Sequence, residues 1–274
     1  MLFRSKSYRV TGRGLILAAP ASGSGKTLVT AGLARHLRQC GLSIGTAKAG
    51  PDFIDPTFHS VATGGPCFNL DVWGMRPATL AALVTELEGA ADIVLCEGAM
   101  GLFDGTGPDG ETASTAELAR ITGWPIVLVV DASGQGASIA ALLRGFAIHQ
   151  PAVPLAGVIF NRVSSERHSA LLTAATVRHL PFLARLGALT SDPDLAVPSR
   201  HLGLVPAGEV SNAETVIESC AARIGAALDL GQLTGLARRS VLSAAGPTTL
   251  IPSLGQRIAV ARDMAFCFAY PALF

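Results

Sequence analysis

Apolar runs alternate with helical patterns along most of this chain. Strand candidates are 14–19, 43–48, 92–97, 125–131, 155–161 and 202–206. The runs at 93–96 and 126–130 are continuously apolar, which is typical of parallel strands covered on both faces. Helical spacing of apolar residues falls between them, over 27–40, 77–89, 113–122, 136–149, 166–179 and 212–228. This alternation predicts an α/β fold with a doubly wound, mostly parallel sheet.

The pattern changes near residue 230. Residues 231–255 are rich in Gly, Pro, Ser and Thr and are predicted to form a linker. A new strand pattern begins at 257–261, and a lone strand cannot bury itself. We therefore predict one domain over 1–230 and the first strand of a second domain over 256–274. A terminal edge strand added to the first sheet is the alternative.

The composition agrees with a large buried core, because 49% of the 274 residues are apolar and 15% are charged. A net charge of +1 gives no strongly positive potential that would attract nucleic acid. No apolar stretch approaches the roughly 18 residues that span a bilayer, so no membrane partner is expected. The N-terminus imitates a signal peptide, but its small residues belong to a glycine-rich loop. The five cysteines are scattered and lack paired metal spacing, as is usual for free thiols in a reducing compartment. Together with the missing signal peptide, they predict a cytoplasmic protein.

Two lysines stand out, because the chain has only three lysines among its 21 basic residues. Because arginine supplies nearly all the other positive charges of the chain, a lysine suggests a site that needs a compact ammonium group. Lys26 lies in the sequence SGSGKT, after an apolar run and before a helical pattern. Such a loop cradles phosphate with backbone N–H groups, while the lysine reaches the β- and γ-phosphates and the Thr27 hydroxyl binds Mg²⁺. An ordinary Ser/Gly helix cap is the alternative.

Lys48 opens a second loop, KAGPDFIDP, at the end of a predicted strand. Ligands of a doubly wound sheet bind at such carboxyl ends. Asp52 and Asp55 in this loop could hold Mg²⁺ directly or through water, and Lys48 could neutralise a transferred phosphoryl group. Asp55 stands before Pro56 and is also a good helix N-cap, whereas Asp52 has no such local role.

Three further strand ends carry candidate polar groups. Glu97 ends a buried strand and is a candidate Mg²⁺ ligand, followed by glycines that permit close approach of a ligand. Asp131 is a rival Mg²⁺ ligand or a helix cap. Asn161 could read an adenine edge or simply form a turn. The six histidines show no metal-ligand spacing, and surface or packing roles are expected for them.

These motifs together resemble those of the cobyrinic/hydrogenobyrinic acid a,c-diamide synthases of cobalamin biosynthesis. The matching segments are 19–27, 48–56, 69–73, 97–105, 131–136 and 160–163. Pro20, which departs from the general phosphate-loop pattern, is usual in this family, and Phe53 stands where many members carry tyrosine. The resemblance implies a P-loop NTPase fold of the dethiobiotin synthetase-like kind.

The resemblance also implies an ATP-dependent carbon–nitrogen ligase. ATP would phosphorylate a peripheral carboxylate of a tetracarboxylate-type corrinoid, and ammonia would displace the phosphate. By analogy with the family, Thr27, Asp52 and Glu97 would surround Mg²⁺. Lys26 and Lys48 would hold the γ-phosphate, and Asp55 and Asp104 would orient substrate or intermediate. The residues expected to bind the nucleotide are Gly23, Ser24, Gly25, Lys26, Thr27, Leu28 and Asn161.

The family joins this domain to a class I glutamine amidotransferase-like domain whose cysteine releases ammonia. Residues 257–274 resemble only the first strand of that domain, no Gly-x-Cys-x-Gly elbow occurs, and Cys267 is a poor nucleophile candidate. We therefore expect ammonia from a glutaminase domain or a separate chain, no glutaminase activity in this chain, and a homodimer.

Several alternatives stay open at this point. Within the same chemistry, the chain could be a cobyric acid synthase, a nickel-sirohydrochlorin a,c-diamide synthase or a dethiobiotin synthetase relative. A non-catalytic P-loop nucleotide switch is the alternative from another class. Partitioning-type ATPases carry a second lysine where this chain has Ala21, which counts against the switch.

Overall fold

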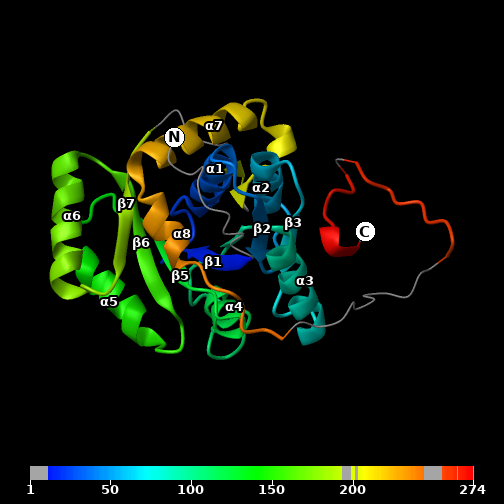
Figure 1. Cartoon of the computed structure of the whole chain (residues 1–274), viewed down its shortest axis with the longest axis horizontal. Helices are drawn as coiled ribbons and strands as arrows, with labels where there is room; N and C mark the ends of the chain where they lie inside the picture. Colours follow the sequence, from blue (N-terminus) through cyan, green and yellow to red (C-terminus); the bar gives the residue numbers. More distant parts are fainter. Residues whose placement is uncertain (1–11, 193–198, 201–202, 244–254, 264, 274) are drawn as a thin grey trace.

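The computed structural model describes residues 12–192, 199–200, 203–243, 255–263 and 265–273. Seven strands form one sheet, and each neighbouring pair runs parallel (Figure 1). Their order across the sheet is β3 (Cys67–Leu70), β2 (Ile44–Ala49), β4 (Ile93–Glu97), β1 (Arg13–Ala18), β5 (Ile126–Asp131), β6 (Leu155–Val163) and β7 (Ala184–Thr190). The predicted doubly wound α/β fold is confirmed.

Helices cover both faces of the sheet. One face packs against α3 (Pro77–Ala90), α4 (Thr115–Thr122), α5 (Ile139–His149) and α6 (Glu166–His179). The other face packs against α1 (Lys26–Gln39), α2 (Asp55–Thr63), α7 (Ala213–Ala227) and α8 (Leu230–Leu236). Alternate residues of β1 enter the two cores, Ile16 on the first face and Leu15 and Leu17 on the second. A strand buried on both faces is apolar at every position, which explains the continuous runs.

The edges of the sheet differ from the expectation. The sequence analysis missed β3, β7 and the short helix α2, while the six predicted helices and five of the six strand candidates are present. The candidate at 202–206 is wrong. Only β9 (Gly203–Leu204) forms there, and it pairs antiparallel with β8 (Ser199–Arg200) outside the main sheet. β3 has only four residues, and β7 is half-buried and interrupted at Gly187, so neither edge strand has a long apolar run.

The C-terminal part also departs from the expectation. The described residues 231–243 of the predicted linker include most of α8, and Arg238 exchanges two backbone hydrogen bonds with Gly14 of β1. Residues 244–254 lie outside the described part. The strand expected over 257–261 is not formed, and the segment ends in a short turn, η3 (Pro271–Leu273), beside β3 (Figure 1). The division into domains stays a prediction.

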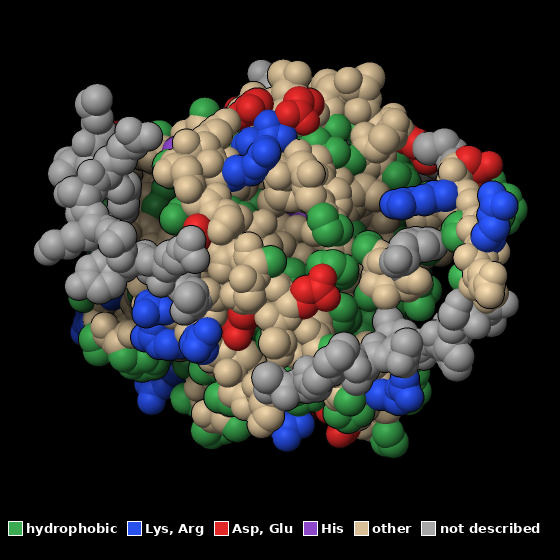
Figure 2. Space-filling view, turned by 45° about the vertical axis from the view of Figure 1, so that its right-hand side comes forward, with side chains coloured by type: hydrophobic (Ala, Val, Ile, Leu, Met, Phe, Trp, Pro, Cys, Tyr) green, Lys and Arg blue, Asp and Glu red, His purple; other side chains and the backbone are tan. Residues whose placement is uncertain are grey.

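The surface carries both signs of charge. On the face drawn in Figure 2, groups of Lys and Arg are interspersed with Asp and Glu. Among the helices formed by described residues, none is both long and apolar enough to cross a membrane.

Candidate active site

The glycine-rich loop between β1 and α1 presents backbone rather than side chains. Gly23 and Gly25 adopt left-handed conformations, with φ of 79° and 87°. No heavy atom lies within 4 Å of the position that a Cβ on Gly23 would take. Gly25 caps α1, so the unpaired N–H groups of the first helical turn adjoin this open loop. Such a cradle is suited to an anion.

Lys26 follows the loop and is 7% exposed. Its Nζ donates a hydrogen bond to the carbonyl oxygen of Met100 at 2.7 Å. Burial lowers the pKa of Lys26, and the nearby Glu97 opposes that shift. The ammonium group thus lies beside the glycine-rich loop, held by a carbonyl that a phosphate oxygen can replace.

Lys48 and Glu97 meet where β2 and β4 end. The two residues are register partners, and Lys48 Nζ lies 3.3 Å from Glu97 Oε1. Burial opposes the charge of Lys48, but the carboxylates of Glu97, Asp55 and Asp52 outweigh it and raise its pKa. Burial also opposes the charge of Glu97, yet Lys48 and the hydrogen bonds that it accepts hold its pKa below the usual range. Both groups are therefore charged at neutral pH.

Asp55 and Asp52 contact the same ammonium group. Lys48 Nζ lies 2.6 Å from Asp55 Oδ2 and 3.5 Å from Asp52 Oδ2. Asp52 Oδ1 also accepts hydrogen bonds from the backbone N–H groups of Ile54 and Asp55 at 2.8 and 3.1 Å. The local turn role considered for Asp55 therefore belongs to Asp52, because the short loop before Pro56 lets an earlier carboxylate reach back to these N–H groups.

Asn69 of β3 fixes this loop from the side. Its Nδ2 donates to the carbonyl oxygens of Gly50 and Asp52 at 3.0 and 2.7 Å. The side chain is buried. The edge strand that the sequence analysis missed thus holds the loop carrying Asp52.

His59 completes the buried cluster and was not singled out from the sequence. Its Nε2 lies 2.6 Å from Glu97 Oε2, and its side chain is 0% exposed. Asp55 lies one helical turn earlier on α2, so both side chains point to the same side of the helix. The sequence signal for His59 was this i, i+4 spacing, which indicates that both residues share a helix face but does not show which residue His59 contacts.

Two of the three predicted magnesium ligands are in contact with each other. Thr27 Oγ1 donates to Glu97 Oε1 at 2.8 Å, so these two groups adjoin. Asp52 approaches the other side of the cluster, next to Lys48. Within the described ranges, no group of three His, Cys, Asp or Glu side chains is arranged to hold a metal ion. The magnesium site of Thr27, Asp52 and Glu97 stays a prediction.

Asp104 and Asp131 have local partners. Asp104 Oδ2 accepts a hydrogen bond from the Gly101 N–H at 2.9 Å and closes the loop after β4. Asp131 accepts from Ser133 and forms an ion pair with Arg162. Asp131 thus serves its own turn and a neighbouring strand end, while Asp104 lies on the loop that also supplies the carbonyl for Lys26.

Asn161 lies over the glycine-rich loop. Its Nδ2 donates to the carbonyl oxygen of Ser24 at 2.9 Å. A Cβ on Gly25 would come within 2.4 Å of this nitrogen, so glycine is required for the close approach. The end of β6 thereby fixes the loop, and the Oδ1 atom of the amide can accept a further hydrogen bond.

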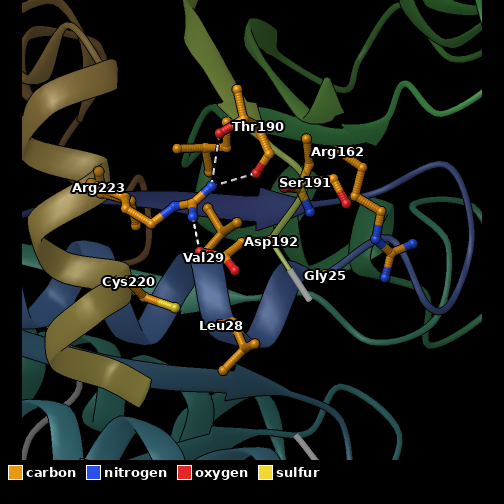
Figure 3. A pocket seen from close by; sticks show the side chains of 12 residues that line it. Gly25, Leu28, Val29, Arg162, Thr190, Ser191, Asp192, Cys220 and Arg223 are labelled. Atoms are coloured by element: carbon orange, nitrogen blue, oxygen red, sulfur yellow. Dashed lines mark hydrogen bonds and ion pairs between the residues drawn. The ribbon is translucent and has the colours of Figure 1, made fainter. Parts of the chain in front are cut away.

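A cavity of about 240 Å³ opens next to Asn161. Gly25 and Leu28 line it from α1, and Thr190 lines it from the end of β7 (Figure 3). Arg223 reaches in from α7 and donates to the carbonyl and hydroxyl oxygens of Thr190 at 2.6 and 2.8 Å, and it pairs with Asp192. The nucleotide-binding residues expected from the sequence include Leu28 and Asn161 but not Thr190 or Arg223. Thr190 was missed because β7 was not recognised as a strand, and Arg223 lies on a predicted helix but in no motif that points to this cavity.

The C-terminal segment touches the loop of Lys48. Phe53 stacks on Phe268 and Tyr270, with ring centroids 5.4 and 5.2 Å apart. The Tyr270 hydroxyl donates to Asp71 Oδ2 at 2.8 Å, and burial together with this carboxylate raises the pKa of Tyr270. Residues 268–270 therefore pack at the rim of the candidate site.

A parallel sheet whose first strand feeds a glycine-rich loop and then a helix is the arrangement of P-loop nucleotide-binding proteins, and this chain is of that class. Residues 15–204 match the CobQ/CobB/MinD/ParA nucleotide binding domain. The chain belongs to this family.

Two relatives within this family have a more specific name than the domain itself. The chain is 48% identical over 261 residues to a hydrogenobyrinate a,c-diamide synthase of Rhodobacter capsulatus, covering 94% of this chain and 59% of that protein. It is 46% identical over 266 residues to one of Rhizobium meliloti, covering 95% and 59%. The family resemblance drawn from the motifs is confirmed, and the chain spans about 59% of the length of these relatives.

A solved structure was also found to be similar. The septum site-determining protein MinD of Pyrococcus horikoshii is 17% identical, with a TM-score of 0.45, and the match covers 81% of this chain and 98% of that one.

Proposed function

We propose that this chain is the ATP-dependent synthetase part of a corrinoid a,c-diamide synthase of cobalamin biosynthesis. It amidates the a and c peripheral carboxylates of hydrogenobyrinic or cobyrinic acid. The pairing of the buried Lys48 with Glu97 and Asp55, beside the glycine-rich loop, is the observation that carries the proposal. The names of the relatives support the substrate class.

The reaction proceeds in two steps. A carboxylate oxygen of the corrinoid attacks the γ-phosphorus of ATP, the bond to the β–γ bridging oxygen breaks, and ADP leaves. Ammonia then adds to the carbonyl carbon of the acyl phosphate, loses a proton and expels inorganic phosphate. Lys26 and Lys48 stabilise the charge on the transferred group, and Asp55 and Asp104 orient the corrinoid or the acyl phosphate.

The residues fit a magnesium nucleotide. The Thr27 hydroxyl and Glu97 Oε1 are already adjacent, so both could turn to one ion when their hydrogen bond is exchanged. Asp52 would have to turn away from Lys48 to be the third ligand. Mg²⁺ would neutralise charge on the β- and γ-phosphates there. The open backbone around Gly23 accepts those phosphates.

The cavity beside Asn161 takes the nucleoside. Leu28 supplies an apolar wall, and the Oδ1 atom of Asn161 supplies an acceptor that suits the exocyclic amine of adenine. Arg223 and Thr190 close the far side. In this proposal the base lies next to the glycine-rich loop, and the triphosphate extends from it toward Lys48.

Ammonia is proposed to come from a glutaminase domain or a separate glutaminase chain. The sequence contains no Gly-x-Cys-x-Gly elbow, and Cys267 is an exposed thiol on an irregular segment. Glutamine alone is therefore not expected to support amidation by this chain. A homodimer in the cytoplasm is the proposed active form.

The test supplies the purified chain with a corrinoid, MgATP and either ammonium or glutamine, and follows amide formation by mass spectrometry. Ammonium should support the reaction and glutamine should not. Lys26→Ala and Glu97→Gln should each abolish acyl phosphate formation, trapped with hydroxylamine, whereas Thr30→Val should not. Binding of MgATP without amidation of either corrinoid would contradict the substrate assignment, and activity in both variants would contradict the site.

A further inference from the structure

His59 has no role in the reaction as derived so far, although it is buried in the candidate site. Two side chains of α2 reach the sheet, Asp55 to Lys48 at 2.6 Å and His59 to Glu97 at 2.6 Å. Lys48 and Glu97 are themselves register partners in β2 and β4. Helix α2 is thus connected at two points to the pair of charges that the sheet brings together.

The two oxygens of Glu97 have different partners. Oε2 faces His59, whereas Oε1 faces Thr27 at 2.8 Å and Lys48 at 3.3 Å. An ionised carboxylate only accepts hydrogen bonds, so Nε2 of His59 carries the hydrogen and donates it. With Oε2 held in this way, Oε1 is the oxygen directed at the glycine-rich loop.

The contact with Glu97 also explains why a histidine is found at this fully buried position. His59 Nδ1 is buried and has no hydrogen-bond partner in the described part of the chain. Burying a polar atom without a partner is unfavourable, and an apolar side chain of similar size would avoid that cost. Packing alone therefore does not account for His59, whereas donation to Glu97 does.

We propose that His59 is a positioning residue for magnesium-dependent nucleotide binding. By holding Glu97 Oε2, it keeps Oε1 turned toward Thr27, and these two oxygens would hold the ion. The inference rests on the proposed function only in that MgATP is the ligand, and it does not depend on the corrinoid.

The experiment measures ATP binding by calorimetry with and without Mg²⁺, for the wild type and for His59→Leu and His59→Gln. In H59L, the gain in ATP affinity that Mg²⁺ provides should fall by about 10–100-fold, the usual loss when a group supporting a metal ligand is removed. ATP binding without Mg²⁺ should stay near the wild-type value. H59Q should keep most of the gain, because the glutamine amide can still donate to Glu97.

Thr30→Val is the matched control, because Thr30 is also buried and its hydroxyl has no partner among the described residues. It should keep the wild-type gain. A folded H59L with the wild-type gain would overturn the proposal, as would a wild type that gains nothing from Mg²⁺. If H59L does not fold, His59→Asn replaces it in the test. The asparagine amide is too short to reach Glu97, so this variant should also lose the gain in ATP affinity that Mg²⁺ provides. Magnesium-dependent binding without amidation would refute only the proposed function.

Discussion

Lys48 and Glu97 face each other from two neighbouring parallel strands, with Nζ of the lysine 3.3 Å from Oε1 of the glutamate. Their side chains are only 2% and 1% exposed. Taking either charge out of water is costly, and their mutual attraction offsets that cost only at a fixed short distance. The strand register supplies this distance, so the two charges that we propose to serve phosphoryl transfer are held together by the fold itself.

Replacing Lys48 with methionine should destabilise the fold. The change leaves the buried Glu97 and the half-buried Asp55 without their cation, so we expect a loss of about 3–5 kcal/mol in the free energy of unfolding, measured by urea denaturation. Lys26→Met is the control, because its ammonium contacts a neutral carbonyl, and a loss of about 1.5–3 kcal/mol is expected. Equal losses in the two variants would show that the ion pairing of Lys48 adds nothing.

Stability should fall in acid partly through Glu97. Burial alone would raise the pKa of this carboxyl, but Lys48 and the hydrogen bonds from His59 and Thr27 bring it below the ordinary 4.5. A carboxyl with a lowered folded-state pKa contributes stability that is present above its unfolded pKa and is lost as the pH falls through the folded one. The free energy of unfolding should therefore decrease as the pH drops below 4.5.

The control for this titration is Glu97→Gln, which has no carboxyl to protonate. Urea denaturation at a series of pH values should give a shallower decrease below pH 4.5 in the variant than in the wild type. Parallel curves would mean that Glu97 has the same pKa in the folded and unfolded chain.

Much of the fold was predictable from the sequence because its central strands are buried on both faces. A run such as Leu15–Leu17 has no polar position, and few other structures produce it. The edge strand β3 has four residues and β7 is interrupted at Gly187, whose φ of 136° departs from regular strand geometry. The helix α2 has nine residues, so its apolar pattern covers only between two and three turns, although the Asp55-Pro56 pair indicates a helix start.

The candidate site was predictable where a residue type was rare or the spacing local. Lys48 was found because lysine is scarce, and Glu97 because it ends a buried strand. His59 was missed because its partner lies 38 residues away along the chain, and a lone histidine has no spacing that indicates a partner. The turn role of Asp52 was missed because Asp55, directly before Pro56, has the usual sequence pattern of a helix cap, whereas Asp52 lies three residues earlier and has no such pattern.

Gly25→Ala should weaken nucleotide binding. Gly25 has φ of 87°, and a Cβ there would lie 2.4 Å from Asn161 Nδ2, so the amide must move away from the loop. Gly41→Ala is a matched control, because Gly41 has φ of 92° and open space around the added atom. Both variants should lose about 1–2 kcal/mol of stability from the left-handed backbone. Only G25A should also lose ATP affinity in calorimetry, and equal affinities in the two variants would contradict this account of the loop.

Two substitutions of Asp52 should separate the two roles of its carboxylate. Its Oδ1 accepts from the Ile54 and Asp55 N–H groups, and its Oδ2 lies 3.5 Å from Lys48. Asp52→Asn keeps an acceptor for the turn but removes the charge, so its stability should stay within about 0.5 kcal/mol of wild type. Asp52→Ala removes both and should lose about 1 kcal/mol, as for a lost helix cap. If Asp52 binds Mg²⁺, both variants should lose acyl phosphate formation, measured with hydroxylamine. Full activity in D52N would leave Asp52 with the turn alone.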